Sequence, residues 1–208
     1  MDPTSSRRPA PRRPRPAGDD RAGARSPVAG AADAGRAAAS DDVQGGHGAP
    51  LWRLLDATAQ ALQAVRSGQS GTTALAVVDG ALRPGVQALL FQTLRHLGLA
   101  QAVRRQLAPR NPPPRVDALL CTALALAWDP AQAPYEPFTL VNQAVEAAKR
   151  QAATQPQSAF LNACLRRFLR ERDALVAAAQ TDPVARWNHP AWWIDRLRQD
   201  HPAHWQQI

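Results

Sequence analysis

An arginine-rich segment near the C-terminal end carries the clearest chemical signal in this sequence. The segment from Phe160 to Arg172 reads FLNACLRRFLRER, and its residues follow the period of an amphipathic helix. The apolar face consists of Phe160, Leu161, Cys164, Leu165, Phe168 and Leu169. The other face carries Arg166, Arg167, Arg170 and Arg172. A helix that packs one face into a core while presenting guanidinium groups on the other is suited to binding phosphates.

The composition is compatible with an anionic partner. The chain of 208 residues has a formal net charge of +8 and a pI of about 11.2, and 45% of its residues are hydrophobic. Because Lys149 is the only lysine and alanine is abundant, part of the high pI reflects codon usage at the source.

The sequence gives little support for a disulfide framework, a metal site, a membrane span or a secretory signal. Cys121 and Cys164 occupy apolar helical positions without the spacing of a disulfide framework or a metal site. No metal is expected, because no acidic or cysteine partners in a defined pattern accompany His189, His201 and His204. The hydrophobic run at 118–128 is too short to span a bilayer, and no secretory signal is recognisable. We therefore predict a cytoplasmic protein with reduced thiols.

The apolar residues that must position such a site repeat with helical period almost throughout residues 50–208. The predicted helices cover residues 50–65, 72–78, 84–97, 99–107, 115–128, 139–152, 160–172 and 190–199. Ser158 is suited to cap the arginine-rich helix, and 115–128 is expected to be the most buried helix. No segment alternates with period two for long enough to predict a strand. The fold class is all-α, a bundle of about seven to eight short helices.

Residues 1–48 have a different composition from the rest of the chain. They are rich in Pro, Arg, Ala, Gly and Asp and lack periodic apolar residues, so we predict a disordered tail. The eight arginines and six aspartates of this tail nearly cancel in charge.

The run from Thr139 to Arg172, TLVNQAVEAAKRQAATQPQSAFLNACLRRFLRER, resembles the signature end of the NusB-like helical domain. In that family, V-N-x-A-V-E-x-A-K is followed by a short loop and then F-x-N-x-x-L-R. The matching residues here are Val141, Asn142, Ala144, Val145, Glu146, Ala148, Lys149, Phe160, Asn162, Leu165 and Arg166. The resemblance implies a NusB-like fold in which these two helices pack side by side.

The segment from Trp187 to Ile208 resembles the connector of bacterial ribosomal RNA cytosine-C5 methyltransferases of the RsmB (Sun/Fmu) type. His189, Pro190 and Trp192 match its H-P-x-W element. Beyond the tail at 1–48, which its composition sets apart, the resemblance implies a NusB-like RNA-binding domain at 49–180 and a connector at 181–208. The connector would lead to a methyltransferase domain that is absent from this chain.

The same resemblance implies a chemistry that these residues do not supply. The family's enzymes bind S-adenosylmethionine at a glycine-rich loop and use two cysteines, in Pro-Cys and Thr-Cys settings. Cys121 follows leucine and Cys164 follows alanine, and no glycine-rich strand–loop–helix is present. We therefore predict no catalytic residues and no cofactor in this chain, with S-adenosylmethionine bound by the missing domain. Alone, the chain should transfer no methyl group.

The packing implied by the resemblance gathers the basic residues onto one surface. The candidate RNA-binding residues are Lys149, Arg150, Arg166, Arg167, Arg170, Arg95, Arg104 and Arg105. We expect them to contact phosphates, with little sequence preference and strong salt dependence. In the competing interpretation, pairs such as Arg167–Glu171 only stabilise helices.

Three functions remain open at this point. In the first, the chain is the substrate-recognition domain of a small-subunit ribosomal RNA methyltransferase, with ribosomal RNA and its own catalytic domain as partners. Alternatively, it is a stand-alone NusB-like antitermination or RNA-binding factor that regulates transcription, although that factor's N-terminal arginine-rich motif is not evident. The third alternative is a structural module that docks onto a catalytic domain and never touches RNA. None of the three calls for a membrane or a metal.

Overall fold

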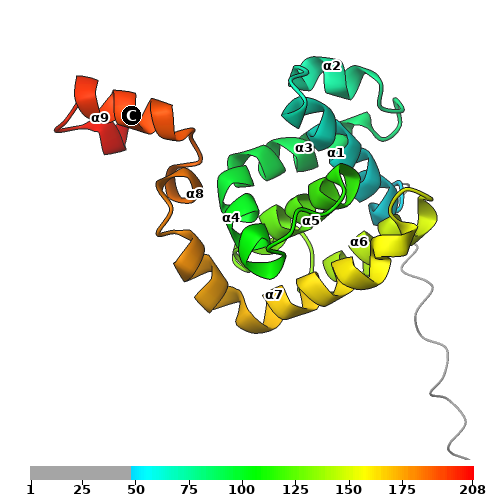
Figure 1. Ribbon diagram of the computed structural model, residues 1–208. Coiled ribbons are helices and arrows are strands. Elements are labelled where there is room, and N and C mark those ends of the chain that lie inside the picture. Colours follow the sequence, from blue (N-terminus) through cyan, green and yellow to red (C-terminus); the bar gives the residue numbers. More distant parts are fainter. Residues whose placement is uncertain (1–47) are drawn as a thin grey trace, which may run out of the picture. The chain divides into compact units, whose positions relative to one another are not determined.

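The computed structural model describes residues 48–208, which form nine α-helices and two 3-10 helices without a β-strand (Figure 1). The helices are α1 (Leu51–Arg66), α2 (Gly71–Ala76), α3 (Arg83–Arg95), α4 (Leu97–Leu107), α5 (Pro114–Ala127), α6 (Pro137–Arg150), η1 (Gln155–Gln157), α7 (Ser158–Ala179), α8 (Pro183–Trp187), α9 (Ala191–Asp200) and η2 (Trp205–Gln207). The all-α fold class is confirmed. The predicted disordered tail lies outside the described residues except for Gly48. The helix α8 was not predicted, because five residues are too few to show a period.

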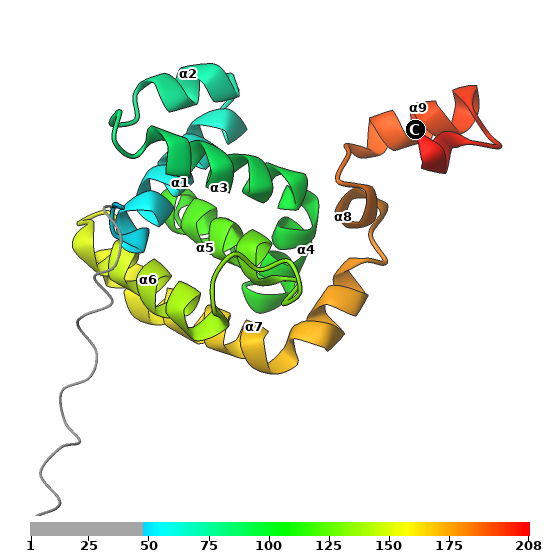
Figure 2. The ribbon, with the colours of Figure 1, turned by 180° about the vertical axis from the view of Figure 1, so that it is seen from behind.

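The helix α5 lies at the centre of the bundle. Every residue from Val116 to Ala127 is buried, and α5 packs against α1, α3, α4, α6 and α7. Views from opposite sides show these five helices around it (Figures 1 and 2). A helix that is apolar on all sides is stable only when it is enclosed in this way. The prediction that this helix is the most buried one is therefore confirmed.

The helix α7 differs from its prediction at both ends. Ser158 is already helical, with φ −62° and ψ −38°, because the 3-10 helix η1 leads directly into α7. Its side chain makes no capping hydrogen bond, so the predicted cap is wrong. At the other end, α7 continues to Ala179 past a kink at Glu171, where φ is −114° and ψ is 15°. Beyond the kink, Gln106 of α4 donates a hydrogen bond to the Leu175 carbonyl at 3.1 Å.

The chain continues from α7 into α8, which lies beside α4, and then into α9. The helix α8 packs against α4, whereas α9 packs mainly against α8 and η2. Trp187 at the end of α8 and Trp205 at the start of η2 make an edge-to-face contact, with their ring centroids 5.1 Å apart, which links these two helices. Trp192 and Trp193 are 68% and 40% exposed. Two of the four tryptophans in this region therefore fasten the helices, and two face solvent.

Candidate nucleic-acid interface

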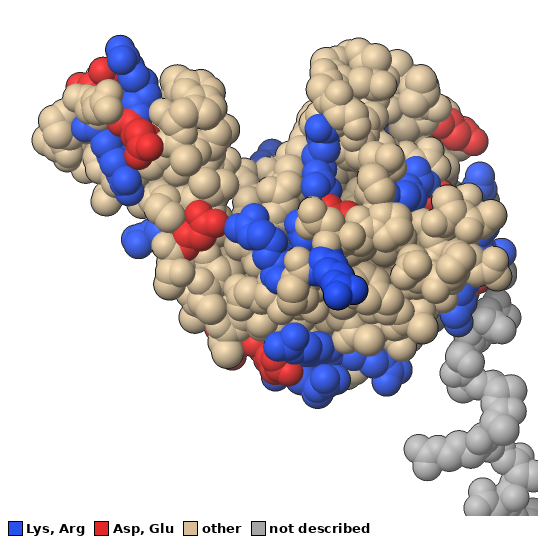
Figure 3. Space-filling view, in the orientation of Figure 1, with Lys and Arg blue, Asp and Glu red and all other residues tan. Residues whose placement is uncertain are grey.

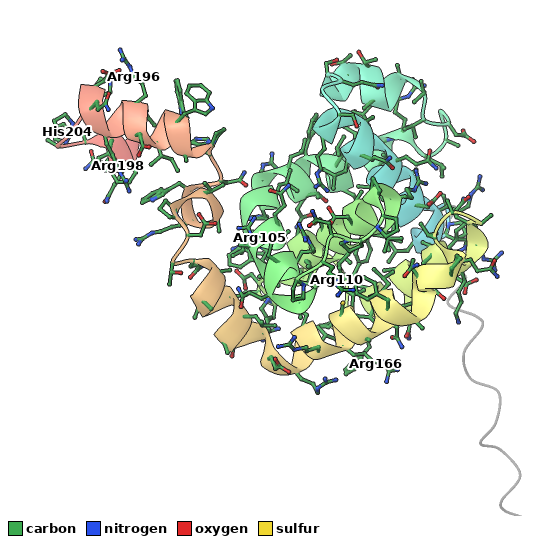
Figure 4. The ribbon with its side chains drawn as sticks, in the orientation of Figure 1. Arg105, Arg110, Arg166, Arg196, Arg198 and His204 are labelled. Atoms are coloured by element: carbon green, nitrogen blue, oxygen red, sulfur yellow. The ribbon has the colours of Figure 1, made fainter. Side chains whose placement is uncertain are left out.

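Three arginines of α7 form an exposed group that we call the α7 arginine row: Arg166, Arg167 and Arg170. The opposite face of the same helix inserts Leu161, Leu165 and Phe168 into the core, each at most 1% exposed. Residues three or four apart share a face of a helix, so this burial fixes the outward direction of the arginines. Figure 4 shows Arg166 pointing away from the bundle, and Figure 3 shows basic side chains gathered along α7.

The charges of the α7 arginine row are only partly neutralised. Arg167 Nε lies 3.0 Å from Glu171 Oε2 in an exposed pair four residues apart. Arg166 Nε donates to the neutral amide oxygen of Asn162 at 3.2 Å. Arg170 forms no ion pair within residues 48–208. Because exposed ion pairs contribute about 1 kcal/mol or less, a phosphate can compete with Glu171 for Arg167.

The end of α6 adds a second basic group. Lys149 and Arg150 are both exposed, and α6 packs beside α7, as predicted. Arg150 Nε lies 2.6 Å from Glu146 Oε1, and its guanidinium lies 4.7 Å from the ring centroid of Trp52. Since η1 joins α6 to α7, this group lies near the start of α7. Arg166 is eight residues farther, about 12 Å along the helix. The two groups are therefore separate clusters on the surface of the bundle.

Arg104 does not lie on this exposed surface, so its predicted place there beside the other candidate residues is wrong. Its side chain is only 9% exposed. Arg104 Nε lies 2.9 Å from Asp117 Oδ1, and Nη1 donates to Asn111 Oδ1 at 2.8 Å. One helical residue step of about 100° separates it from Arg105, which faces solvent.

The remaining upstream arginines are exposed. Arg95 ends α3, and Arg105 lies on α4, where its Nη2 is 2.9 Å from Asp182 Oδ2. Arg110, in the loop after α4, is also exposed and was not among the predicted residues. Figure 4 places Arg105 and Arg110 on the face in view, with Arg166 at its lower edge. An isolated arginine in a proline-rich loop gives no periodic signal by which the sequence could have identified it.

The two cysteines have the environment of buried structural thiols. Burial, with a smaller contribution from Asp117, raises the pKa of Cys121 to about 12. Burial also raises the pKa of Cys164. A thiol must lose its proton to act as a nucleophile, so neither residue is activated for attack at neutral pH.

The described residues also do not fit the other sites considered. Residues 48–208 contain no strand, and therefore no glycine-rich strand–loop–helix of the doubly wound type. No group of three His, Cys, Asp or Glu side chains suited to a metal ion occurs in the same range. Nor is any helix there both long and apolar enough to cross a bilayer.

Comparison with known proteins identifies a group of relatives. No protein-family model matches the chain. The ribosomal RNA small subunit methyltransferase B of Vibrio cholerae is 30% identical over 163 residues, which cover 73% of this chain and 36% of that protein. The probable enzyme of the same name from Coxiella burnetii is 34% identical over 71 residues, covering 34% of this chain and 16% of the relative. The ribosomal RNA small subunit methyltransferase B of Citrobacter koseri is 36% identical over 73 residues, which cover 35% of this chain and 16% of that protein.

The chain thus spans about a third of the length of the Vibrio cholerae relative. The aligned residues extend over most of this chain, and the part of it that the structure describes consists of helices and connecting loops without a strand. The chain is therefore an RsmB-like N-terminal region, related to ribosomal RNA small subunit methyltransferase B.

Proposed function

We propose that this chain is the RNA-binding, substrate-recognition region of a ribosomal RNA cytosine-C5 methyltransferase. The observation that carries the proposal is the α7 arginine row, which faces solvent because the other side of the helix is locked in the core. Two of its three charges are not opposed by a carboxylate within residues 48–208. The names of the relatives favour ribosomal RNA as the polyanion.

In this proposal the chain positions RNA and does not perform the methyl transfer. The arginines bind phosphates, which hold the strand without reading its bases. S-adenosylmethionine and the reactive cysteines would belong to a methyltransferase domain that acts beside this NusB-like region. Both would work in the cytoplasm, where ribosomal RNA is modified.

The proposal is tested by measuring binding of a small-subunit ribosomal RNA fragment at several salt concentrations. The variant Arg166→Gln/Arg170→Gln removes two phosphate contacts, so the slope of log K against log salt should fall by about 2. The matched control is Arg53→Gln/Arg196→Gln, which removes the same charge from exposed positions on α1 and α9.

The control should keep nearly the slope of the unmodified protein. If both double variants lose affinity equally, binding follows net charge alone and the α7 arginine row has no special role. If neither changes, the region does not bind RNA through these residues. Circular dichroism establishes that each variant remains folded.

A further inference from the structure

A cleft of about 300 Å³ opens where α1 ends, α4 ends and α5 begins. Its lining includes the charged side chains Arg66, Arg104 and Asp117 and the amides Gln63 and Asn111. It lies on helices other than α6 and α7, which carry the α7 arginine row and the basic end of α6.

Two guanidinium groups in this cleft share a single carboxylate. Arg66 Nη1 lies 2.6 Å from Asp117 Oδ2, and Arg104 Nε lies 2.9 Å from Asp117 Oδ1. Each carboxylate oxygen therefore faces one guanidinium group, although Asp117 Oδ1 accepts no aligned hydrogen bond within residues 48–208. The three side chains together retain one positive charge. Asp117 and Arg104 are 7% and 9% exposed at the side chain, so water screens this excess charge poorly.

The cleft also contains donors without a partner. A guanidinium has five N–H donors, and the hydrogen bonds of Arg66 within residues 48–208 use one of them, toward Asp117. Arg104 Nε is buried near Asp117, yet it makes no aligned hydrogen bond in the described part of the chain. Arg66, at 31% exposure, forms the side of the cleft that solvent reaches.

The start of α5 adds to the positive potential. Asp117 lies in the first turn of this 14-residue helix, which begins at Pro114 on the cleft wall. The first turn of a helix carries the positive end of the helix dipole. Pro114 has no N–H and the N–H of Asp117 donates to the Pro113 carbonyl, so the contribution is that of the dipole alone. An anion in the cleft would therefore meet the helix end in addition to the two guanidinium groups.

We propose that this cleft binds one phosphate group, held by Arg66 and Arg104, with Gln63 and Asn111 as neutral donors. A phosphate would supply the countercharge that Asp117 alone does not provide, and guanidinium groups bind it through paired N–H donors. Inorganic phosphate and an RNA phosphodiester offer the same oxygens. Binding of an RNA phosphodiester rests on the proposed function, whereas binding of inorganic phosphate does not.

The first experiment titrates the protein with inorganic phosphate and follows the melting temperature, with sodium chloride of equal ionic strength as the reference. Phosphate should raise the melting temperature of the unmodified chain in a concentration-dependent manner. Arg66→Gln should weaken phosphate binding about tenfold or more, because a charge-assisted contact is lost. Arg53→Gln, the same change at an exposed position on the same helix, should leave the response intact.

A second variant keeps the test decisive if Arg66→Gln fails to fold. Arg66→Lys retains the charge beside Asp117 but not the planar fork, so it should fold and still bind phosphate more weakly. Equal phosphate responses in the unmodified protein and both folded variants would overturn the proposal. No response in the unmodified protein would overturn it too, and would leave the ion pairs as a link between helices.

The RNA arm distinguishes the two sources of phosphate. If the cleft takes an RNA phosphodiester, Arg66→Gln should reduce the salt slope of RNA binding by about 1. An unchanged slope with a lost response to inorganic phosphate assigns the cleft to the free anion. Arg166→Gln/Arg170→Gln should keep the response to inorganic phosphate, so failure of the α7 arginine row and failure of the cleft are separable.

Discussion

The side-chain oxygen of Asn188 accepts a hydrogen bond from the backbone N–H of Gly98 at 2.8 Å. The same amide donates through Nδ2 to the carbonyl of Leu94, also at 2.8 Å. Asn188 ends α8 with φ 54°, a left-handed conformation that asparagine tolerates better than most residues. One amide thus fastens α8 to the junction of α3 and α4.

Replacing Asn188 with alanine should loosen this attachment. Both hydrogen bonds are lost, and the N–H of the buried Gly98 has no replacement partner, which costs about 1–3 kcal/mol locally. Hydrogen exchange measured by mass spectrometry should accelerate in residues 183–200 and remain unchanged in α5. Asn142→Ala, at an exposed site on α6, is the matched control. Unchanged exchange in residues 183–200 would show that the amide bridge does not hold α8.

Gly98→Ala should displace α8 by steric conflict. A Cβ at this position would lie 2.5 Å from the backbone oxygen of Val184, which cannot rotate away as a flexible side chain can. We expect a loss of about 1–3 kcal/mol in urea unfolding, with faster proteolysis between α7 and α9. At Gly71, in α2, a Cβ meets no atom within 4 Å, so Gly71→Ala should be neutral or stabilising. Equal stability of the two variants contradicts the proposed close contact.

The ion pairs of Asp117 and Asp182 should contribute very different amounts to the free energy of unfolding. Asp117→Asn removes the countercharge of the buried Arg104 and should cost about 3–5 kcal/mol of unfolding free energy. Asp182→Asn breaks an exposed pair with Arg105 but keeps a side-chain oxygen that can cap α8, so about 1 kcal/mol or less is expected. Chemical denaturation of both variants measures the contrast. A loss at position 117 no greater than that at 182 would mean that burial adds nothing to the pair.

Stability should decrease in mild acid because of His96. Burial, and then the nearby Arg95, lower the pKa of His96, while Asp129 opposes them. The unfolded chain, with a histidine pKa of about 6.5, therefore binds the proton first as the pH falls. The unfolding free energy should be constant above this value and decline below it, until the folded protein is protonated as well. Urea titrations from pH 8 to pH 5 should show that His96→Gln flattens this decline, whereas His201→Gln, at an exposed site, does not.

Cys121 should resist alkylation in the folded protein. Its pKa of about 12 leaves almost no thiolate at pH 8, and its side chain has no access to solvent. Mass spectrometry after iodoacetamide treatment should find Cys121 unmodified without denaturant and fully labelled in urea. Fast, stoichiometric labelling of Cys121 under native conditions would contradict the burial in α5.

Most of the helices were predictable from the sequence because the spacing of apolar residues within each segment indicates a helix. The predicted bounds of α1 to α6 and α9 lie within two residues of those observed. The position of α5 at the centre followed from its lack of a polar face. The kink in α7 and the helix α8 were not predictable. Both occur where local periodicity is weak, and α8 is positioned by Gly98 and Asn188, which are far apart in sequence.

The candidate site likewise has a part that the sequence predicts and a part that only the structure shows. The sequence alone determined that Arg166, Arg167 and Arg170 face outward, because the apolar residues between them dictate which side of the helix is buried. Only the tertiary structure decided that Arg104 is buried against Asp117 while its neighbour Arg105 is exposed. The outward direction of a side chain follows from its own helix. The partner of a charge depends on which distant helix packs beside it, and that choice is made by the core.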